Sequence, residues 1–163
     1  MKLNKLQKKI GISFKDDKLL IQALTHKSFD TKNNYEKLEF LGDRVLGFVI
    51  SKKLLELYPN EKVGMIDKKL ANLVNKNKCF EIGKELELDN YILTGNTEKK
   101  KKVNIEKKII SDCCESLIGA IYIDKGFEVS SKFILNYWKN YLNLSDITVI
   151  DSKTRLQEYS LKK

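Results

Sequence analysis

Apolar residues recur along most of this sequence at the three- and four-residue spacing of amphipathic helices. Alternation of apolar and polar residues, the pattern of a half-buried strand, is scarce, and Pro59 is the only proline. We therefore predict an all-α protein with a polar loop over Gly95–Asn104. The expected helices cover Leu3–Ile10, Asp16–Thr25, Tyr35–Tyr58, Met65–Asn77, Cys79–Leu86, Glu106–Ile123 and Phe127–Leu142.

The third expected helix differs from the others because it is apolar nearly all round. Its middle segment, LEFLGDRVLGFVI at residues 38–50, carries apolar side chains on almost every side. Pro59 is expected to end this helix, because proline cannot continue the backbone hydrogen bonding. A helix with this pattern is buried on several sides. We predict that it lies at the centre of the domain or at an interface between subunits.

Acidic residues interrupt two of the apolar helices. At about 100° per residue, Glu36, Glu39 and Asp43 fall within an arc of about 60° on one helix. A second pair, Asp112 and Glu115, lies three residues apart among the apolar residues of another helix. Like charges on one helix face repel one another, and burying them costs much more unless an opposite charge compensates. The acids therefore require a counter-charge.

A divalent cation is one candidate for that counter-charge. Arg44 is the only arginine near the first group, and it projects about 100° away from Asp43. Carboxylate oxygens without histidine or cysteine partners favour Mg²⁺ or Mn²⁺ over zinc. Two simpler interpretations stay open. Glu36 could complement the helix dipole, and Asp112 with Glu115 could belong to a capping box.

Length, charge and cysteine content narrow the class of protein. The 163 residues suffice for one domain with a single core. Lys and Arg total 31 against 22 acidic residues, and the net charge of +9 suggests a polyanionic partner, either nucleic acid or an anionic membrane surface. The apolar stretches are too short to span a bilayer, and the N-terminus lacks the apolar core of a signal peptide. Three cysteines without a CxxC pair indicate reduced thiols in a cytoplasmic protein.

Three segments of the chain resemble motifs of the ribonuclease III family. NYEKLEFLGDRVLGFVI (34–50) is similar to the family's signature helix, and ALTHKS (23–28) is similar to the motif just upstream. DCCESLIGAIYIDKGFE (112–128) is similar to its second acidic segment, and the order and spacing agree. The resemblance implies the all-α, homodimeric fold of the ribonuclease III endonuclease domain. It also implies a cytoplasmic endoribonuclease that cuts double-stranded RNA, leaves 5′-phosphate and 3′-hydroxyl ends, and acts in rRNA and mRNA processing.

The same resemblance implies roles for the acidic residues. Glu39, Asp43, Asp112 and Glu115 match the family's four metal-binding carboxylates. Asp43 and Glu115 are expected to be catalytic, and Glu36 is expected to have an auxiliary role. The expected cofactor is Mg²⁺, with Mn²⁺ as a substitute, and neither a small-molecule cofactor nor a membrane partner is expected.

A lysine-rich surface is expected to bind duplex RNA by shape and charge, because A-form duplexes present phosphates and 2′-hydroxyls to proteins. The candidate RNA-binding residues are Lys68, Lys100, Lys101, Lys102, Lys107 and Lys108. The alternative for this run is a solvated, lysine-rich loop. His26, the single histidine, excludes sites that need two histidine ligands, and we expect it to be a structural hydrogen-bonding residue rather than a base.

The two ends of the chain are expected to differ in organisation. Residues 1–145 are predicted to form the catalytic domain. The segment DSKTRLQEY (151–159) resembles the opening of the double-stranded-RNA-binding domain of bacterial ribonuclease III. Residues 146–163 are therefore predicted to be a linker and the truncated start of such a domain.

The chain also departs from the family pattern. Val63 stands before Gly64 where many members carry an acid, and Lys102 with Val103 replaces a common glycine pair. Two rival classes remain. A non-catalytic double-stranded-RNA-binding protein could use the same fold, although the presence of all four carboxylates argues against it. A lysine-rich helical DNA-binding module would leave the buried acids unexplained.

Overall fold

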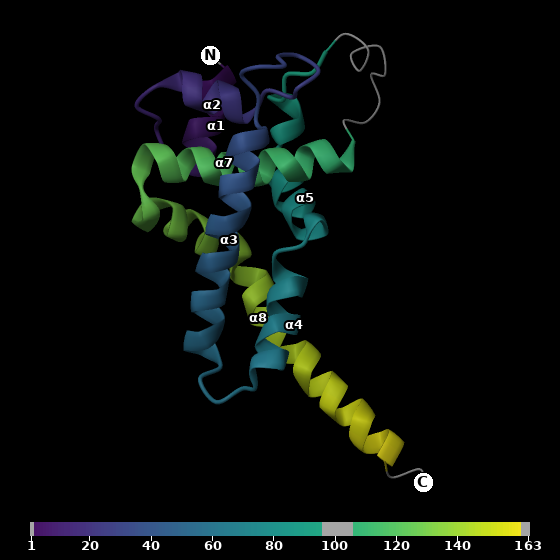
Figure 1. Cartoon of the computed structure of the whole chain (residues 1–163). Coiled ribbons are helices and arrows are strands. Elements are labelled where there is room, and N and C mark those ends of the chain that lie inside the picture. The colour runs from purple at the N-terminus through teal and green to yellow at the C-terminus, as the bar shows by residue number, and fades with distance from the viewer. Residues whose placement is uncertain (1, 96–105, 161–163) are drawn as a thin grey trace.

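The computed structural model describes residues 2–95 and 106–160, with side chains described over residues 3–95 and 106–144. Within these ranges the chain is helical and forms no strand, apart from an isolated bridge between Thr25 and Leu93. The predicted all-α fold is therefore confirmed. The elements are α1 (Lys2–Ile10), α2 (Asp17–Ala23), α3 (Glu36–Leu57), α4 (Val63–Leu73), α5 (Lys76–Glu85), the 3₁₀ turn η1 (Leu88–Asn90), α7 (Lys107–Lys125) and α8 (Phe127–Ser160) (Figure 1).

Local sequence signals explain several helix ends. The side chain of Asp16 accepts a hydrogen bond from the backbone N–H of Lys18 and caps α2. Asn75 caps α5 in the same way, and its side chain accepts from the N–H of Lys78. Helix α7 ends before Gly126, whose φ of 80° lies in the region that favours glycine. These signals fix where α5 begins and where α7 ends.

Helix α7 is the central element of the fold. Every residue from Ile109 to Ile121 is buried, and α7 lies across α3 with α1 and α2 on one side of it (Figure 1). Helix α3 instead keeps one side exposed, where Phe40, Phe48 and Leu55 are 65%, 60% and 58% exposed. The interface position predicted for α3 therefore fits better than the central one, which α7 occupies.

The backbones of α3 and α7 touch where the two helices cross. A Cβ atom added to Gly42 would lie 1.7 Å from the carbonyl oxygen of Glu115. A Cβ atom added to Gly119 would lie 2.2 Å from the carbonyl oxygen of Leu38. Glycine at both positions permits this close contact. The contact fixes the register of the helices, so that the acids before Gly42 face those before Gly119.

Helix α8 continues as one helix through the expected domain boundary at residue 145, and the backbone is helical to Ser160. The division into residues 1–145 and 146–163 stays a prediction.

The three cysteines are free and buried. Every helix in the described part of the chain is too short or too polar to cross a lipid bilayer.

Candidate metal centre

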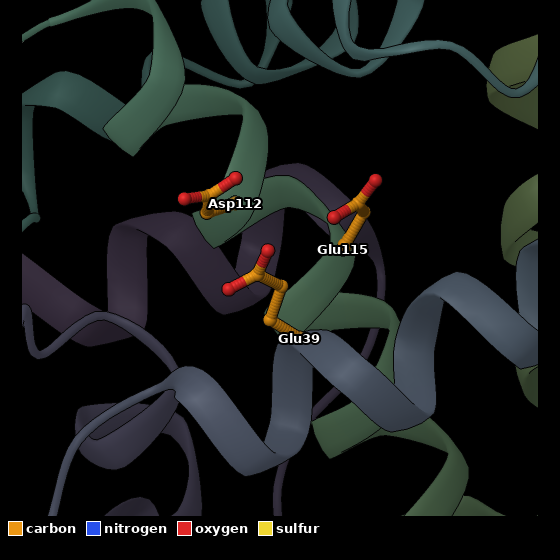
Figure 2. A group of neighbouring side chains, drawn as sticks. All are labelled: Glu39, Asp112 and Glu115. Carbon is orange, nitrogen blue, oxygen red and sulfur yellow. The ribbon is translucent and has the colours of Figure 1, made fainter.

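Three carboxylates converge where α3 crosses α7 (Figure 2). Glu39 comes from α3, and Asp112 and Glu115 come from successive turns of α7. One oxygen of each lies within 4.8 Å of the others. Asp112 and Glu115 are buried, whereas Glu39 is partly exposed. This group has the donor type and the spacing of a site for a hard divalent cation.

Two lysines supply counter-charge to the cluster. Lys76, the first residue of α5, donates from its Nζ to Glu39 Oε1 at 3.0 Å, Asp112 Oδ1 at 2.8 Å and Glu115 Oε2 at 2.7 Å. Lys108 donates to Asp112 Oδ2 at 2.6 Å from one turn earlier on α7. Neither lysine was predicted as a counter-charge from the sequence, where Arg44 was the only basic residue considered near the acids. The counter-charge that the buried acids require can therefore come from lysine ammonium groups as well as from a metal ion.

Neutral donors complete the contacts of the two buried acids. The Tyr35 hydroxyl donates to Asp112 Oδ2 at 3.5 Å, and the Cys79 thiol donates to Glu115 Oε1 at 3.7 Å. Burial and neighbouring negative charge raise the pKa of Tyr35. A hydrogen bond with Cys114 and burial raise the pKa of Cys79. Both groups therefore stay protonated near neutral pH and remain donors.

The three carboxyl groups of the cluster differ in acidity. Burial raises the pKa of Glu115 to about 7, against the opposing effect of the Lys76 ammonium. Burial also raises the pKa of Glu39. Asp112 is buried as well, but hydrogen bonds from Lys108 and Lys76 outweigh the effect of burial and lower its pKa. Near neutral pH, Asp112 is ionised while Glu115 is close to its titration midpoint.

This difference predicts how pH affects the metal-free protein. The pKa of Glu115 rises from 4.5 to about 7 on folding, so the folded state binds more protons between these values. The free energy of unfolding should therefore fall as the pH rises through this interval, by an amount on the order of 3 kcal/mol. Urea unfolding in the presence of a chelator, from pH 4.5 to 8, measures the change. Glu115→Gln should remove this part of the slope, and an identical slope in both proteins would contradict the assignment.

The other predicted acids lie outside the group of three. Asp43, one turn after Glu39, forms an ion pair with Arg44, although its charge still contributes to the raised pKa of Glu115. Glu36 lies in the first turn of α3 and pairs with Lys27 at 3.2 Å. The shared arc of about 60° on the helical wheel thus does not bring all three acids of α3 together.

The capping-box interpretation of the second pair is wrong. Helix α7 begins at Lys107, after Glu106 at the N-cap position. Asp112 and Glu115 therefore lie inside the helix rather than at its first turn. Their side chains reach α3 and α5 instead of the helix's own backbone N–H groups.

The predicted RNA-binding lysines have different environments. Lys68 is exposed on α4, and Lys107 lies over the ring of Phe80 with its Nζ 5.1 Å from the centroid. Lys108 is held by Asp112. Lys100, Lys101 and Lys102 lie outside the described residues. The role of these lysines in RNA binding stays a prediction. The Nδ1 of His26 lies 2.8 Å from the Ser28 hydroxyl, and its structural role stays a prediction.

Comparison with known proteins decides the family. The sequence profile of the ribonuclease-III-like family matches residues 16–142. The chain is 61% identical to ribonuclease 3 of Pelagibacter ubique, over 99% of this chain and 73% of that protein. The chain belongs to the ribonuclease III family. Ribonuclease 3 of Hahella chejuensis is 44% identical, over 97% of this chain and 70% of that protein. The resemblance inferred from the three motifs is confirmed, and the chain is an endoribonuclease of the ribonuclease III family.

Solved structures agree with this family assignment. The nuclease domain of ribonuclease III from Campylobacter jejuni matches with a TM-score of 0.80 and 37% identity, over 84% of this chain and 96% of that chain. In the Campylobacter nuclease domain, a region involved in dimer formation shows structural flexibility. Dicer from Pichia stipitis matches with a TM-score of 0.63 at 21% identity, over 82% of this chain and 59% of that chain, and shares the fold. The predicted endonuclease-domain fold is confirmed.

Proposed function

We propose that this chain hydrolyses phosphodiester bonds of double-stranded RNA with Mg²⁺ as cofactor, for which Mn²⁺ can substitute. The products carry 5′-phosphate and 3′-hydroxyl ends, and the activity serves rRNA and mRNA processing in the cytoplasm. The observation that carries the proposal is the meeting of Glu39, Asp112 and Glu115 within 4.8 Å at the crossing of α3 and α7. Membership of the ribonuclease III family supplies the class of reaction.

The donor set of the cluster fits this cofactor. All three groups offer hard carboxylate oxygens, which Mg²⁺ and Mn²⁺ prefer. The Lys76 ammonium lies against one oxygen of each, so the space between them accepts a cation. The nearby Cys79 thiol has a raised pKa and stays protonated, which disfavours metals that bind thiolates. When bound, Mg²⁺ lowers the pKa of a water and neutralises charge on the leaving oxygen.

Each acidic residue has a proposed role. Glu39, Asp112 and Glu115 hold the ion, and Asp43 is the fourth metal-binding carboxylate. Asp43 lies one turn beyond Glu39, and this role requires it to leave its ion pair with Arg44. Asp43 and Glu115 are the catalytic pair in this proposal. Glu36, paired with Lys27 at the start of α3, has an auxiliary role.

Substrate binding in this proposal rests on the basic character of the chain. The net charge of +9 favours a polyanion, and the A-form duplex offers its phosphates and 2′-hydroxyls across a shallow minor groove. Lys68 and Lys107 on the surface, together with Lys100, Lys101, Lys102 and Lys108, are the proposed contacts. RNA affinity should therefore fall steeply as the salt concentration rises.

Cleavage of an end-labelled RNA duplex tests the proposed reaction. We expect cleavage with Mg²⁺ or Mn²⁺ and none with a chelator, and we expect single-stranded RNA and a DNA duplex of the same sequence to stay intact. Phosphatase and ligase treatment of the products identifies the expected ends. Cleavage that survives the chelator would contradict the metal role. Tight duplex binding without cleavage under every condition would favour the non-catalytic alternative.

The exposed side of α3 supports a homodimer. Phe40, Phe48 and Leu55 fall within an arc of about 80° and are all more than half exposed. The ring of Phe48 also contacts Phe127 of α8 edge-on, with the centroids 5.6 Å apart. An apolar stripe of this kind marks an interaction surface. We therefore propose that two copies of the chain associate through this side of α3.

Replacing both phenylalanines of this stripe should dissociate the homodimer. Burial of each ring contributes about 2 kcal/mol, so Phe40→Glu with Phe48→Glu should weaken association by more than about a hundredfold. Sedimentation velocity across a concentration series measures the change. The control is Phe29→Glu, which removes a similarly exposed ring, 52% exposed, from the segment between α2 and α3. A double variant that stays dimeric at the lowest concentrations would exclude this surface.

A further inference from the structure

We infer that Lys76 is a built-in counter-ion of the acidic cluster, which competes with the divalent cation and sets how tightly that cation binds. The inference rests on the proposed function, because it takes Glu39, Asp112 and Glu115 as the metal-binding carboxylates. It adds a residue from α5, outside both acidic segments, which occupies the oxygens of the three carboxylates in the metal-free protein.

The contacts of Lys76 carry the inference. An ammonium group has three N–H donors, and the structure gives Lys76 Nζ three carboxylate partners at 3.0, 2.8 and 2.7 Å. The partners come from two helices, so the one ammonium bridges all three carboxylates of the cluster. A magnesium-sized ion bound to the same oxygens needs distances of about 2.1 Å to them. The ammonium and the ion therefore exclude each other.

The position of Lys76 in the fold allows it to leave. It is the first residue of α5, whose start is fixed by the side chain of Asn75, so the backbone does not depend on the ammonium contacts. Its side chain is 53% exposed, whereas those of Asp112 and Glu115 are 0% and 2% exposed. The flexible four-carbon stem can carry the charge into water. The carboxylates stay in place, held by α7.

Lys108 does not have the same role. It donates only to Asp112 Oδ2, whereas Lys76 uses Oδ1 of that residue. Lys108 comes from α7 itself, one turn before Asp112. Among the described residues, it forms no ion pair or hydrogen bond with Glu39 or Glu115. Lys108 can therefore remain on Asp112 while an ion binds the oxygens that Lys76 releases.

This competition is tested by titrating the metal-free protein with Mn²⁺ alone. The paramagnetic resonance signal of the free ion measures how much Mn²⁺ stays unbound. Lys76→Met keeps the length of the side chain and removes its charge. We expect this variant to bind Mn²⁺ about tenfold more tightly than the wild type, because hydrogen bonds between charged groups no longer have to be broken. The matched control is Lys84→Met, which removes a charge from the same helix where the lysine pairs with Asp89 at 2.7 Å. It should bind Mn²⁺ as the wild type does.

A fourth protein, Glu115→Gln, separates this inference from the proposed function. If wild type and Glu115→Gln bind Mn²⁺ equally, the cluster is not the metal site and the proposed function fails. If Glu115→Gln loses binding but Lys76→Met binds no more tightly than the wild type, the metal site stands and the competition by Lys76 is refuted. Tighter binding by Lys84→Met as well would attribute the effect to net charge and would equally refute it.

The wild-type protein gives an independent measurement of the displacement. Acetylation of lysine side chains by a water-soluble ester, quantified by mass spectrometry, reports how freely each amine is exposed. We expect the acetylation rate of Lys76 to rise severalfold when Mn²⁺ is added, because its nitrogen leaves three ion pairs. Lys84 is the internal reference and should not change. An equal rate for Lys76 with and without Mn²⁺ would overturn the inference.

Discussion

Glu115→Gln is expected to lower the rate of duplex RNA cleavage by about a thousandfold or more. A metal ion at such a site contributes several kcal/mol to stabilising the transition state, and each 1.36 kcal/mol is a factor of ten in rate. Glu115 supplies one of the three oxygens that meet within 4.8 Å. The amide of Gln has nearly the same shape but lacks the negative charge that holds the ion. Single-turnover cleavage at saturating protein measures the loss.

The fold and the RNA affinity of this variant should stay close to those of the wild type. Glu115 is buried with a pKa raised to about 7, so the protein already tolerates an uncharged group there. Lys76 keeps its contacts with Glu39 and Asp112. A gel-shift titration in the presence of a chelator and a thermal melt check these two points. The control is Glu81→Gln, an exposed acid on α5 that pairs with Lys78 at 3.0 Å and should cleave normally. Undiminished cleavage by Glu115→Gln would remove this residue from the metal site.

The need for an opposite charge near the acids was predictable from sequence, because the acids interrupt long apolar runs and burying Asp112 and Glu115 without compensation is costly. That Glu39 would meet them came from the resemblance to the ribonuclease III motifs and not from burial. The presence of the helices followed from apolar periodicity, and most observed ends lie within a few residues of the predicted ones. Two predictions were wrong: α8 continues to Ser160 rather than ending at Leu142, and α5 begins at Lys76, inside the helix predicted over Met65–Asn77. The need for counter-charge and the helix positions both follow from the pattern of apolar and charged residues along the sequence.

Lys76 could not be found by the same reasoning. It is separated from Asp112 by 36 positions and from Glu39 by 37, and nothing in its own segment, VNKNK, distinguishes it from the other lysines. Its place depends on how α5 packs against α7, which is a tertiary contact. The one local signal is Asn75, whose capping role places Lys76 at the start of α5. In a chain with 31 Lys and Arg residues, the absence of nearby arginine did not mean the absence of counter-charge.

Asp43 was predicted from sequence to join the acidic cluster, but the structure places it outside the group of three carboxylates. A helical wheel places it beside Glu39, but the wheel ignores which way a side chain turns and what lies next to it. Arg44, the following residue, is close enough to pair with Asp43 and also lies over the ring of Phe40, with 4.9 Å from its guanidinium carbon to the centroid. Asp43 is therefore bound to its neighbour on the outside of α3. Its charge still acts on Glu115.

The geometry of the centre depends on a close backbone contact, and Gly42→Ala should therefore destabilise the protein by about 3 kcal/mol or more. The added methyl group would lie 1.7 Å from the Glu115 carbonyl oxygen and 2.9 Å from the Gly119 nitrogen. Both are backbone atoms of a buried helix, so no side chain can move aside and α3 must separate from α7. Chemical denaturation measures the loss of stability.

The same substitution five residues further along α3 provides the control. A Cβ atom added to Gly47 meets nothing of its own chain within 4 Å, and alanine is the better helix former by about 0.5–1 kcal/mol, so Gly47→Ala should raise the stability of the monomeric chain. The two variants make the same chemical change in one helix with opposite expected signs. If Gly42→Ala folds at all, the separation of the helices should also move Glu39 away from Asp112 and Glu115 and weaken Mn²⁺ binding. Equal stability of the two variants would mean that α3 and α7 do not touch at Gly42, and the crossing that assembles the three carboxylates would then be wrong.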